Sequence, residues 1–90
     1  MMTVREKVWE ILTDVLSVPP HQETSDELSF QDDLDADSID MVAVVGALEE
    51  NFGILIPDAN AEKFSKVGDV LRYLKEEHGF NPDHEMLSQI

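Results

Sequence analysis

Apolar residues at helical spacing predict a first helix from Met1 to Leu16. They recur three or four positions apart, at Val4, Val8, Ile11, Leu12 and Val15, with Trp9 and Leu16 beside them. Thr3 and Glu6 have the spacing of a capping box, in which each side chain accepts a backbone N–H of the first turn. Pro19 and Pro20 should end the helix, because proline has no N–H to donate.

The same spacing predicts a second helix from Ser38 to Phe52. Its buried face is expected at Met41, Val44, Val45, Leu48 and Phe52, with Val42 at the margin. The opposite face should meet solvent or a partner at Ile39, Asp40, Ala43, Ala47 and Glu50. Gly46 in mid-helix costs about 0.5–1 kcal/mol relative to Ala, which indicates close approach of another element, room for a guest, or tolerated drift. Gly53 stands where a left-handed helix cap belongs.

The remaining apolar residues predict two further helices. Ile54–Ile56 is interpreted as a buried extended connection, and Asp58 as the cap of a short helix over Ala59–Lys63. Phe64 should close that helix into the core. A fourth helix is expected from Ser65 to His78, ending at Gly79, with one apolar face of Val67, Val70, Leu71 and Leu74.

Two segments lack a helical pattern. Ser17–Asp37 is a long loop in which Leu28, Phe30 and Leu34 are the expected anchors, with a short helical turn at Ser25–Leu28. Residues 80–90 form a tail that is either frayed or a short extra helix with Met86, Leu87 and Ile90 docked weakly. The prediction is an all-α four-helix bundle over residues 1–79, with a long first loop and a short third helix.

Composition narrows the possible partners. The 90 residues carry 20 acidic and 6 basic side chains, for a net charge of −14. Nucleic acid and anionic membrane are poor partners for such a chain, whereas basic protein surfaces are favoured. There is no Cys, so neither disulfides nor thiolate chemistry is expected from the chain itself. We expect no signal peptide or membrane span, and therefore a cytoplasmic protein. We also expect a monomer.

Ser38 is the candidate site because it begins a helix directly after an acid-rich loop. A phosphate there would be stabilised by free N–H groups and the helix dipole, although a plain N-cap is the alternative. Catalysis by Ser38 lacks a partner base, since His21, His78 and His84 lie elsewhere along the chain. Asp33, Asp35 and Asp37 alternate like calcium ligands, but Ser38 and Val44 stand where an EF-hand needs Gly and Glu, so no specific metal site is predicted.

The stretch Asp33-Leu34-Asp35-Ala36-Asp37-Ser38-Ile39-Asp40 resembles the attachment motif of acyl carrier proteins, usually written D-L-G-A-D-S-L-D. Ala47–Phe52 and Ile56-Pro57-Asp58 fall at the spacing that the family shows downstream. The resemblance covers roughly residues 3 to 78. Asp35 departs from the usual Gly, yet Asp tolerates left-handed geometry better than most residues. Ala43 stands where the family commonly has an acidic residue that contacts enzymes.

This resemblance implies a non-enzymatic carrier with 4'-phosphopantetheine on Ser38, next to Asp37. A phosphopantetheinyl transferase would install the group from coenzyme A, and its thiol would hold acyl chains as thioesters. These would pass between enzymes of fatty-acid, specialised lipid, polyketide or aminoacyl pathways. The implied acyl pocket comprises Val42, Val45, Gly46 and Phe64. The implied docking residues, which would meet basic surfaces of acyl synthases and transferases, are Asp37, Ile39, Asp40, Ala43, Ala47, Glu50 and Asp58. The competing hypothesis is an acidic docking or cation-binding module without a prosthetic group, in which Ser38 is only a cap.

Overall fold

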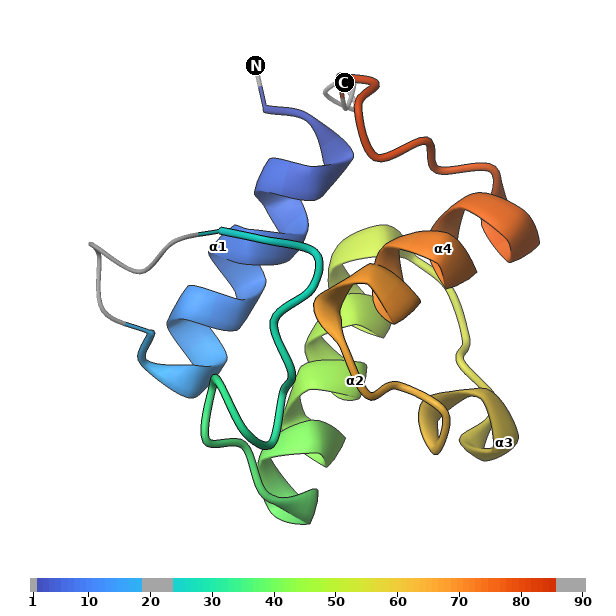
Figure 1. Ribbon diagram of the computed structural model, residues 1–90. Coiled ribbons are helices and arrows are strands. Elements are labelled where there is room, and N and C mark those ends of the chain that lie inside the picture. The colour runs from blue at the N-terminus through green and yellow to red at the C-terminus, as the bar shows by residue number, and fades with distance from the viewer. Residues whose placement is uncertain (1, 19–23, 86–90) are drawn as a thin grey trace.

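The computed structural model describes residues 2–18 and 24–85 and consists of four α-helices (Figure 1). These are α1 (Val4–Leu16), α2 (Ser38–Phe52), α3 (Asp58–Ala61) and α4 (Val67–His78). Within the described ranges, extended pairing is limited to two isolated bridges. The predicted all-α bundle with a long first loop and a short third helix is therefore confirmed.

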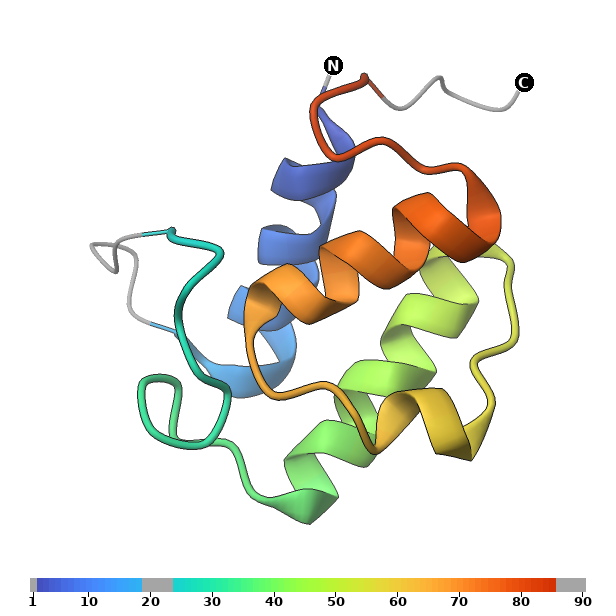
Figure 2. The same ribbon diagram turned by 45° about the vertical axis from the view of Figure 1, so that its right-hand side comes forward.

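One hydrophobic core joins α1, α2 and α4. The predicted apolar stripes of these helices face one another, because each can leave water only against another helix. Figure 2 shows α4 crossing in front of α1 and α2. The most deeply buried side chains come from all three helices: Val8, Leu12, Val44, Leu48, Val67, Val70 and Leu74.

The ends of α1 and α2 follow local sequence signals. Thr3 caps α1 in a full capping box with Glu6, as predicted, so the helix begins at Val4. Ser17, in left-handed geometry with φ 54°, follows its last residue, whereas Pro19 and Pro20 lie outside the described residues. Gly53 ends α2 with φ 66°, as predicted.

The burial of α2 differs from prediction at three residues. Asp40, on the expected solvent face, is half-buried. Ala47 was expected to face solvent but is half-buried against the core, because α1 packs on that side of α2. Val42, expected at the margin of the buried face, is 73% exposed. The rest of the predicted buried face lies in or against the core: Met41, Val44, Val45, Leu48 and Phe52.

The connection from α2 to α3, and α3 itself, correct three predictions. Only part of the apolar run Ile54–Ile56 is buried: Ile56 lies in the core, whereas Leu55 is 82% exposed. Successive side chains of an extended segment point to opposite sides, so such a run cannot bury every member. Asp58 is the first residue of α3 and not its cap, since Pro57 occupies the cap position without a side-chain hydrogen bond. The helix ends at Ala61, two residues before the predicted Lys63.

The first loop is fixed to the start of α4 by backbone hydrogen bonds. The N–H of Gly68 donates to the Asp26 carbonyl (2.8 Å) and that of Val67 to the Leu28 carbonyl (3.0 Å). The N–H of Phe30 donates in return to the Ser65 carbonyl (3.0 Å). Phe30 and Leu34 are buried and Leu28 is half-buried, which confirms the predicted anchors. A turn at Ser25–Leu28 is also present.

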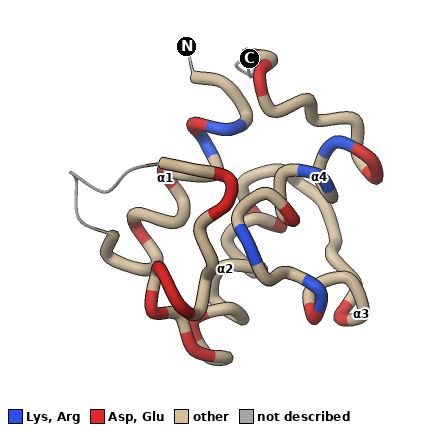
Figure 3. The backbone as a smooth tube through the Cα atoms, viewed as in Figure 1, with Lys and Arg blue, Asp and Glu red and all other residues tan. Residues whose placement is uncertain are grey.

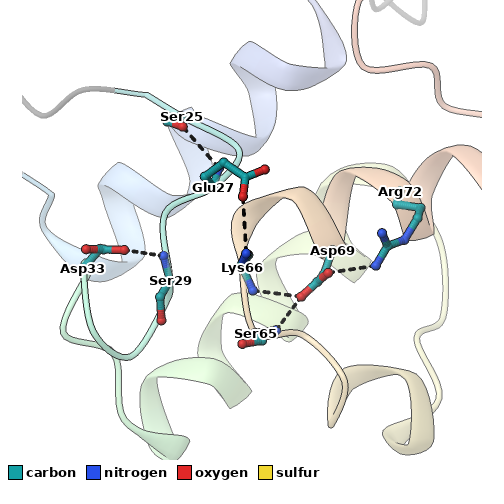
Figure 4. A network of polar contacts seen from close by, with 8 residues as sticks. All are labelled: Ser25, Glu27, Ser29, Asp33, Ser65, Lys66, Asp69 and Arg72. Carbon is teal, nitrogen blue, oxygen red and sulfur yellow. Dashed lines mark hydrogen bonds and ion pairs between the residues drawn. The ribbon is translucent and has the colours of Figure 1, made fainter.

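Charged side chains reinforce the same joint (Figure 4). One Asp69 oxygen accepts the N–H groups of Ser65 (2.9 Å) and Lys66 (2.8 Å), and the other accepts Arg72. Lys66 pairs with Glu27 of the loop. Burial alone would raise the pKa of the Asp69 carboxyl, but the backbone hydrogen bonds and the two cations outweigh it and hold the pKa below its usual value.

Residues 80–85 return to the start of α1 (Figures 1 and 2). The N–H groups of Val4 and Arg5 donate to the carbonyls of His84 (3.0 Å) and Pro82 (2.9 Å). Phe80 packs on Phe52 with ring centroids 5.1 Å apart. The described part of this segment forms a turn rather than a helix, and the predicted contacts of Met86, Leu87 and Ile90 lie outside the described residues.

Candidate attachment site and adjoining groove

Ser38 is the first residue of α2, and it is exposed. The cap is Asp37: its Oδ1 accepts the N–H of Asp40 (2.9 Å), and Asp40 Oδ2 accepts the N–H of Asp37 (3.1 Å). None of the hydrogen bonds between described residues uses the Ser38 hydroxyl. The alternative that Ser38 is a plain N-cap is therefore wrong, and its oxygen stands free beside the positive end of α2.

A pinned turn presents this serine. Asp35 adopts left-handed geometry with φ 59°, as expected for a residue in place of Gly. On either side of it Leu34 and Ala36 are buried, and the N–H of Ala36 donates to the Phe30 carbonyl (2.8 Å). The loop thus turns sharply between two anchored positions and delivers Asp37 and Ser38 to the start of α2.

A groove of about 680 Å³ begins at Ser38 and runs between α2 and α3. Along α2 its lining residues share one helix face: Ser38, Met41, Val42, Val45, Gly46 and Glu49. The far wall consists of Ile56, Asp58, Ala61, Glu62 and Phe64. The four residues of the expected acyl pocket, Val42, Val45, Gly46 and Phe64, all lie in this lining.

Sequence reasoning missed several members of the groove. Glu49 was overlooked, although its spacing of eleven from Ser38 places both on one helix face. Its Oε2 accepts the N–H of Ile56 (2.8 Å), so it also shapes the connection to α3. Ile56, Ala61 and Glu62 follow only from the way α3 folds back, for which the sequence carries no periodic signal.

Gly46 has no close neighbour to explain it. A Cβ built there would meet nothing within 4 Å, so close approach of another element is excluded as its cause. Because Gly46 lines the groove, the absent side chain leaves this part of the α2 wall open. Room for a guest remains a physical reason for a helix-weakening residue at this position.

The exposed face of α2 is acidic and apolar together. Ile39 is 77% exposed, and Asp37, Ala43 and Glu50 are also exposed, whereas Asp40, which shares the capping box with Asp37, is half-buried. Of the other predicted docking residues, Asp58 is exposed at the groove. Ala47 lies apart, lining a different groove against α1.

The charge of the molecule is sharply divided (Figure 3). No Lys or Arg lies between Lys7 and Lys63, and the 14 acidic residues of that segment account for the whole net charge. Four of the six basic residues, Lys63, Lys66, Arg72 and Lys75, cluster on α4 and just before it. Among the described residues, the acidic side chains from Asp32 to Glu62 form no ion pair, so the end of the loop and α2 around Ser38 carry an uncompensated negative field.

Other candidate chemistry finds little support in the described part of the chain. Its acidic and histidine side chains form no cluster that would hold a metal ion. His78 lies 3.3 Å from the Tyr73 hydroxyl and His84 is exposed, whereas His21 is outside the described residues. Burial, and then the charges of Glu77 and Glu49, raise the pKa of Tyr73. None of the described helices has the length and apolar character to cross a membrane.

Comparison with known proteins assigns the family. The sequence model described as "Phosphopantetheine attachment site" matches residues 6–74. The chain belongs to the acyl carrier protein family. It is 46% identical to an acyl carrier protein of Wolinella succinogenes over 74 residues, covering 82% of this chain and 96% of the relative. It is 51% identical to one from Clostridium acetobutylicum over 72 residues, covering 80% and 92%.

A solved structure agrees with this assignment. A candidate acyl carrier protein from Mycobacterium tuberculosis superposes with a TM-score of 0.70 and 25% identity, covering 76% of this chain and 89% of that one. Acyl carrier proteins are carriers and not catalysts: they hold acyl chains on covalently attached 4'-phosphopantetheine. They work with acyl synthases and transferases and with phosphopantetheinyl transferases.

The residues around Ser38 fit such a group. The hydroxyl is exposed and free of capping, and the first-turn N–H groups and the helix dipole of α2 favour a phosphate there. When attached, the group supplies the thiol that holds the acyl chain, which this chain cannot supply because it has no Cys.

Proposed function

We propose that Ser38 is the residue to which 4'-phosphopantetheine is attached. The observation that carries this proposal is the capping of α2. Asp37 and Asp40 cap the helix reciprocally, so the Ser38 oxygen is not needed as a cap and is left free. The same oxygen stands at one end of the groove along α2. An arm attached there has an apolar surface directly beside its point of attachment.

Intact mass tests the attachment. The apo-protein is incubated with coenzyme A, magnesium and a phosphopantetheinyl transferase, and a gain of one phosphopantetheinyl group is expected. Ser38→Ala should gain nothing, whereas Ser65→Ala, an exposed serine outside the motif, should load like the parent protein. A gain that survives Ser38→Ala contradicts the assignment, and no gain at all favours an acidic module without a prosthetic group.

We also assign to enzyme docking Asp58, the cap residue Asp37 and the outward-facing residues of α2, all of which are exposed except the half-buried Asp40. Asp37, Asp40, Glu50 and Asp58 provide negative charge for basic partner surfaces, with Ile39 as an apolar contact. Ala47 is left out of this surface because it is half-buried beside α1. Steering by the acidic field would bring partners toward the side of the molecule that carries Ser38.

Ala43 gives this surface a more apolar character and adapts it to a specialised set of partners. It is exposed on α2 where an acidic residue is common in the family. Restoring that charge with Ala43→Glu should weaken binding to the protein's own synthase or transferase by about tenfold or less, as is usual for one peripheral charge. Unchanged binding at low salt contradicts this role.

The carrier is proposed to act as a monomer that diffuses freely in the cytoplasm between enzymes of fatty-acid or specialised lipid and polyketide synthesis. Support comes from its charge: two copies of −14 repel each other and stay apart. Sedimentation of the loaded protein at physiological salt should give the mass of one chain. A stable dimer contradicts the proposal.

A further inference from the structure

The groove beside Ser38 has apolar walls, but its ionisable lining residues all carry the same sign. Glu49, Asp58 and Glu62 line it, and Lys, Arg and His are absent from its described lining. The remaining lining, apart from the Ser38 hydroxyl and Gly46, is hydrocarbon or thioether. A guest in this groove therefore meets either an apolar surface or a carboxylate.

The positions of these carboxylates matter as much as their sign. Glu49 lies eleven residues beyond Ser38 on the same helix face, which is about 16 Å along the axis of α2. Its Oε2 accepts the N–H of Ile56 (2.8 Å), which fixes the carboxylate at the end of the groove away from Ser38. Asp58 and Glu62 stand on the opposite wall, on α3 and directly after it. A chain that enters at Ser38 and lies along α2 brings its far end toward Glu49.

Gly46 determines whether a chain can pass along this path. It lies one turn before Glu49, and its missing side chain leaves the α2 wall open where a Cβ would meet nothing within 4 Å. The groove is thus open in the middle and negatively charged at its far end and along one wall.

We propose that this groove selects its cargo by charge, sheltering acyl chains with a neutral, apolar far end and rejecting chains that end in a carboxylate. This inference rests on attachment at Ser38. A neutral chain buries apolar surface against Val42, Val45 and Phe64, which is favourable in proportion to the area buried. A terminal carboxylate loses its hydration and meets like charges at Glu49, Asp58 and Glu62, and neither term is compensated by a basic partner in the lining.

Carriers loaded with two chains of matched length test the proposal. Pantetheine analogues with amide-linked octanoyl or 7-carboxyheptanoyl chains are attached enzymatically, and intact mass first establishes that each is on Ser38. The backbone amide signal of Gly46 and the melting temperature are then compared with those of the carrier loaded with pantetheine alone. The octanoyl chain should shift the Gly46 signal and raise the melting temperature, because a bound guest stabilises the folded state. The carboxylate chain should change neither the signal nor the melting temperature.

Charge removal supplies the decisive comparison. The variant Glu49→Gln/Asp58→Asn/Glu62→Gln removes three charges but keeps an oxygen at position 49 that can accept the N–H of Ile56. In this variant the carboxylate chain should enter the groove and therefore shift the Gly46 signal. Asp14→Asn/Glu76→Gln/Glu77→Gln removes the same number of charges from exposed residues outside the groove lining and outside the proposed docking surface, and it should leave the discrimination intact. For the carboxylate chain, the ratio of sheltered to unsheltered molecules should rise about tenfold in the first variant, which corresponds to about 1.4 kcal/mol.

Three results overturn the proposal: equal responses to both chains in the parent protein, no response to either chain, or rescue of the carboxylate chain by the control variant. Failure of pantetheine and of both analogues to load on Ser38 is a different outcome, because it contradicts the attachment itself and is detected by mass before the groove is tested.

Discussion

Gly68 is the residue on which the joint between the first loop and α4 depends. A Cβ at this position would lie 3.1 Å from the carbonyl oxygen of Asp26, the atom that accepts the Gly68 N–H at 2.8 Å. Asp26 is also held by Arg5, so it cannot retreat without loss of contacts. Gly68→Ala should therefore lower the free energy of unfolding by about 1 kcal/mol, despite the better helix propensity of Ala.

Gly46 provides the matched control in chemical denaturation. It is also a helical glycine, but its Cβ would meet nothing within 4 Å. Gly46→Ala should raise the free energy of unfolding by about 0.5–1 kcal/mol, the ordinary gain for this change in a helix. The same sign for both variants would mean that the contact with Asp26 does not constrain Gly68.

At the level of elements, the start of α4 should make stability depend on pH. Hydrogen bonds from the N–H groups of Ser65 and Lys66, with Arg72 nearby, hold the pKa of Asp69 below its usual value even though burial raises it. A carboxyl with a lowered folded-state pKa contributes stability above its unfolded pKa, and that contribution is lost as the pH falls through the folded pKa. Asp69→Asn should therefore cost about 1–2 kcal/mol at pH 7, and this cost should shrink below about pH 4.

Urea unfolding of both proteins between pH 7 and pH 3 measures this cost. Asp14→Asn, at an exposed residue of α1, corrects for the general effect of removing one negative charge. If the difference between the parent protein and Asp69→Asn, so corrected, stays constant across this range, the hydrogen bonds at the start of α4 do not stabilise the ionised carboxyl.

The elements that sequence predicted well are those whose signals are local. Helix ends are marked by contacts within a few residues, as at Thr3 with Glu6 and at Gly53. An apolar stripe can likewise be recognised from the sequence of a single helix. The turn at Asp35 was expected from the resemblance, because the acyl carrier motif usually has Gly at this position and Asp tolerates left-handed geometry. The motif around Ser38 needed no structure either, because its resemblance rests on eight consecutive residues.

The contacts that escaped prediction join segments far apart in the chain. Gly68 with Asp26, and the start of α1 with residues 82–84, are held by backbone hydrogen bonds that any residue except proline can donate. Ala47 was predicted to be exposed and Leu55 to be buried, and both predictions were wrong. Exposure depends on which other element packs against a residue, and not on the residue alone. Glu62 was missed for this reason too, since it joins Glu49 in the groove only when α3 folds back.

At the scale of the whole molecule, stability is limited by charge repulsion concentrated in one part of the chain. The segment between Lys7 and Lys63 has 14 acidic residues and no Lys or Arg, whereas the rest of the chain is balanced (Figure 3). Like charges confined to a compact fold oppose folding, and salt weakens that repulsion as the screening length falls from about 10 Å at 0.1 M to about 3 Å at 1 M. The melting temperature should therefore rise with sodium chloride concentration.

Removal of two charges localises the effect. The variant Asp32→Asn/Asp35→Asn removes two charges from the acidic segment. Asn adopts left-handed geometry readily, so the backbone at residue 35 should not be strained. This variant should melt several degrees higher than the parent protein at 20 mM salt, as about 1 kcal/mol shifts a domain of this size by about 4–8 °C, and the gain should fade at 1 M. Glu76→Gln/Glu77→Gln changes the net charge equally, but beside the basic residues of α4, so it should gain little at either salt concentration. Equal gains from the two variants would mean that total charge, and not its confinement around Ser38, limits stability. A larger gain from the first variant would mean instead that the acidic loop before Ser38 is maintained at a cost in stability.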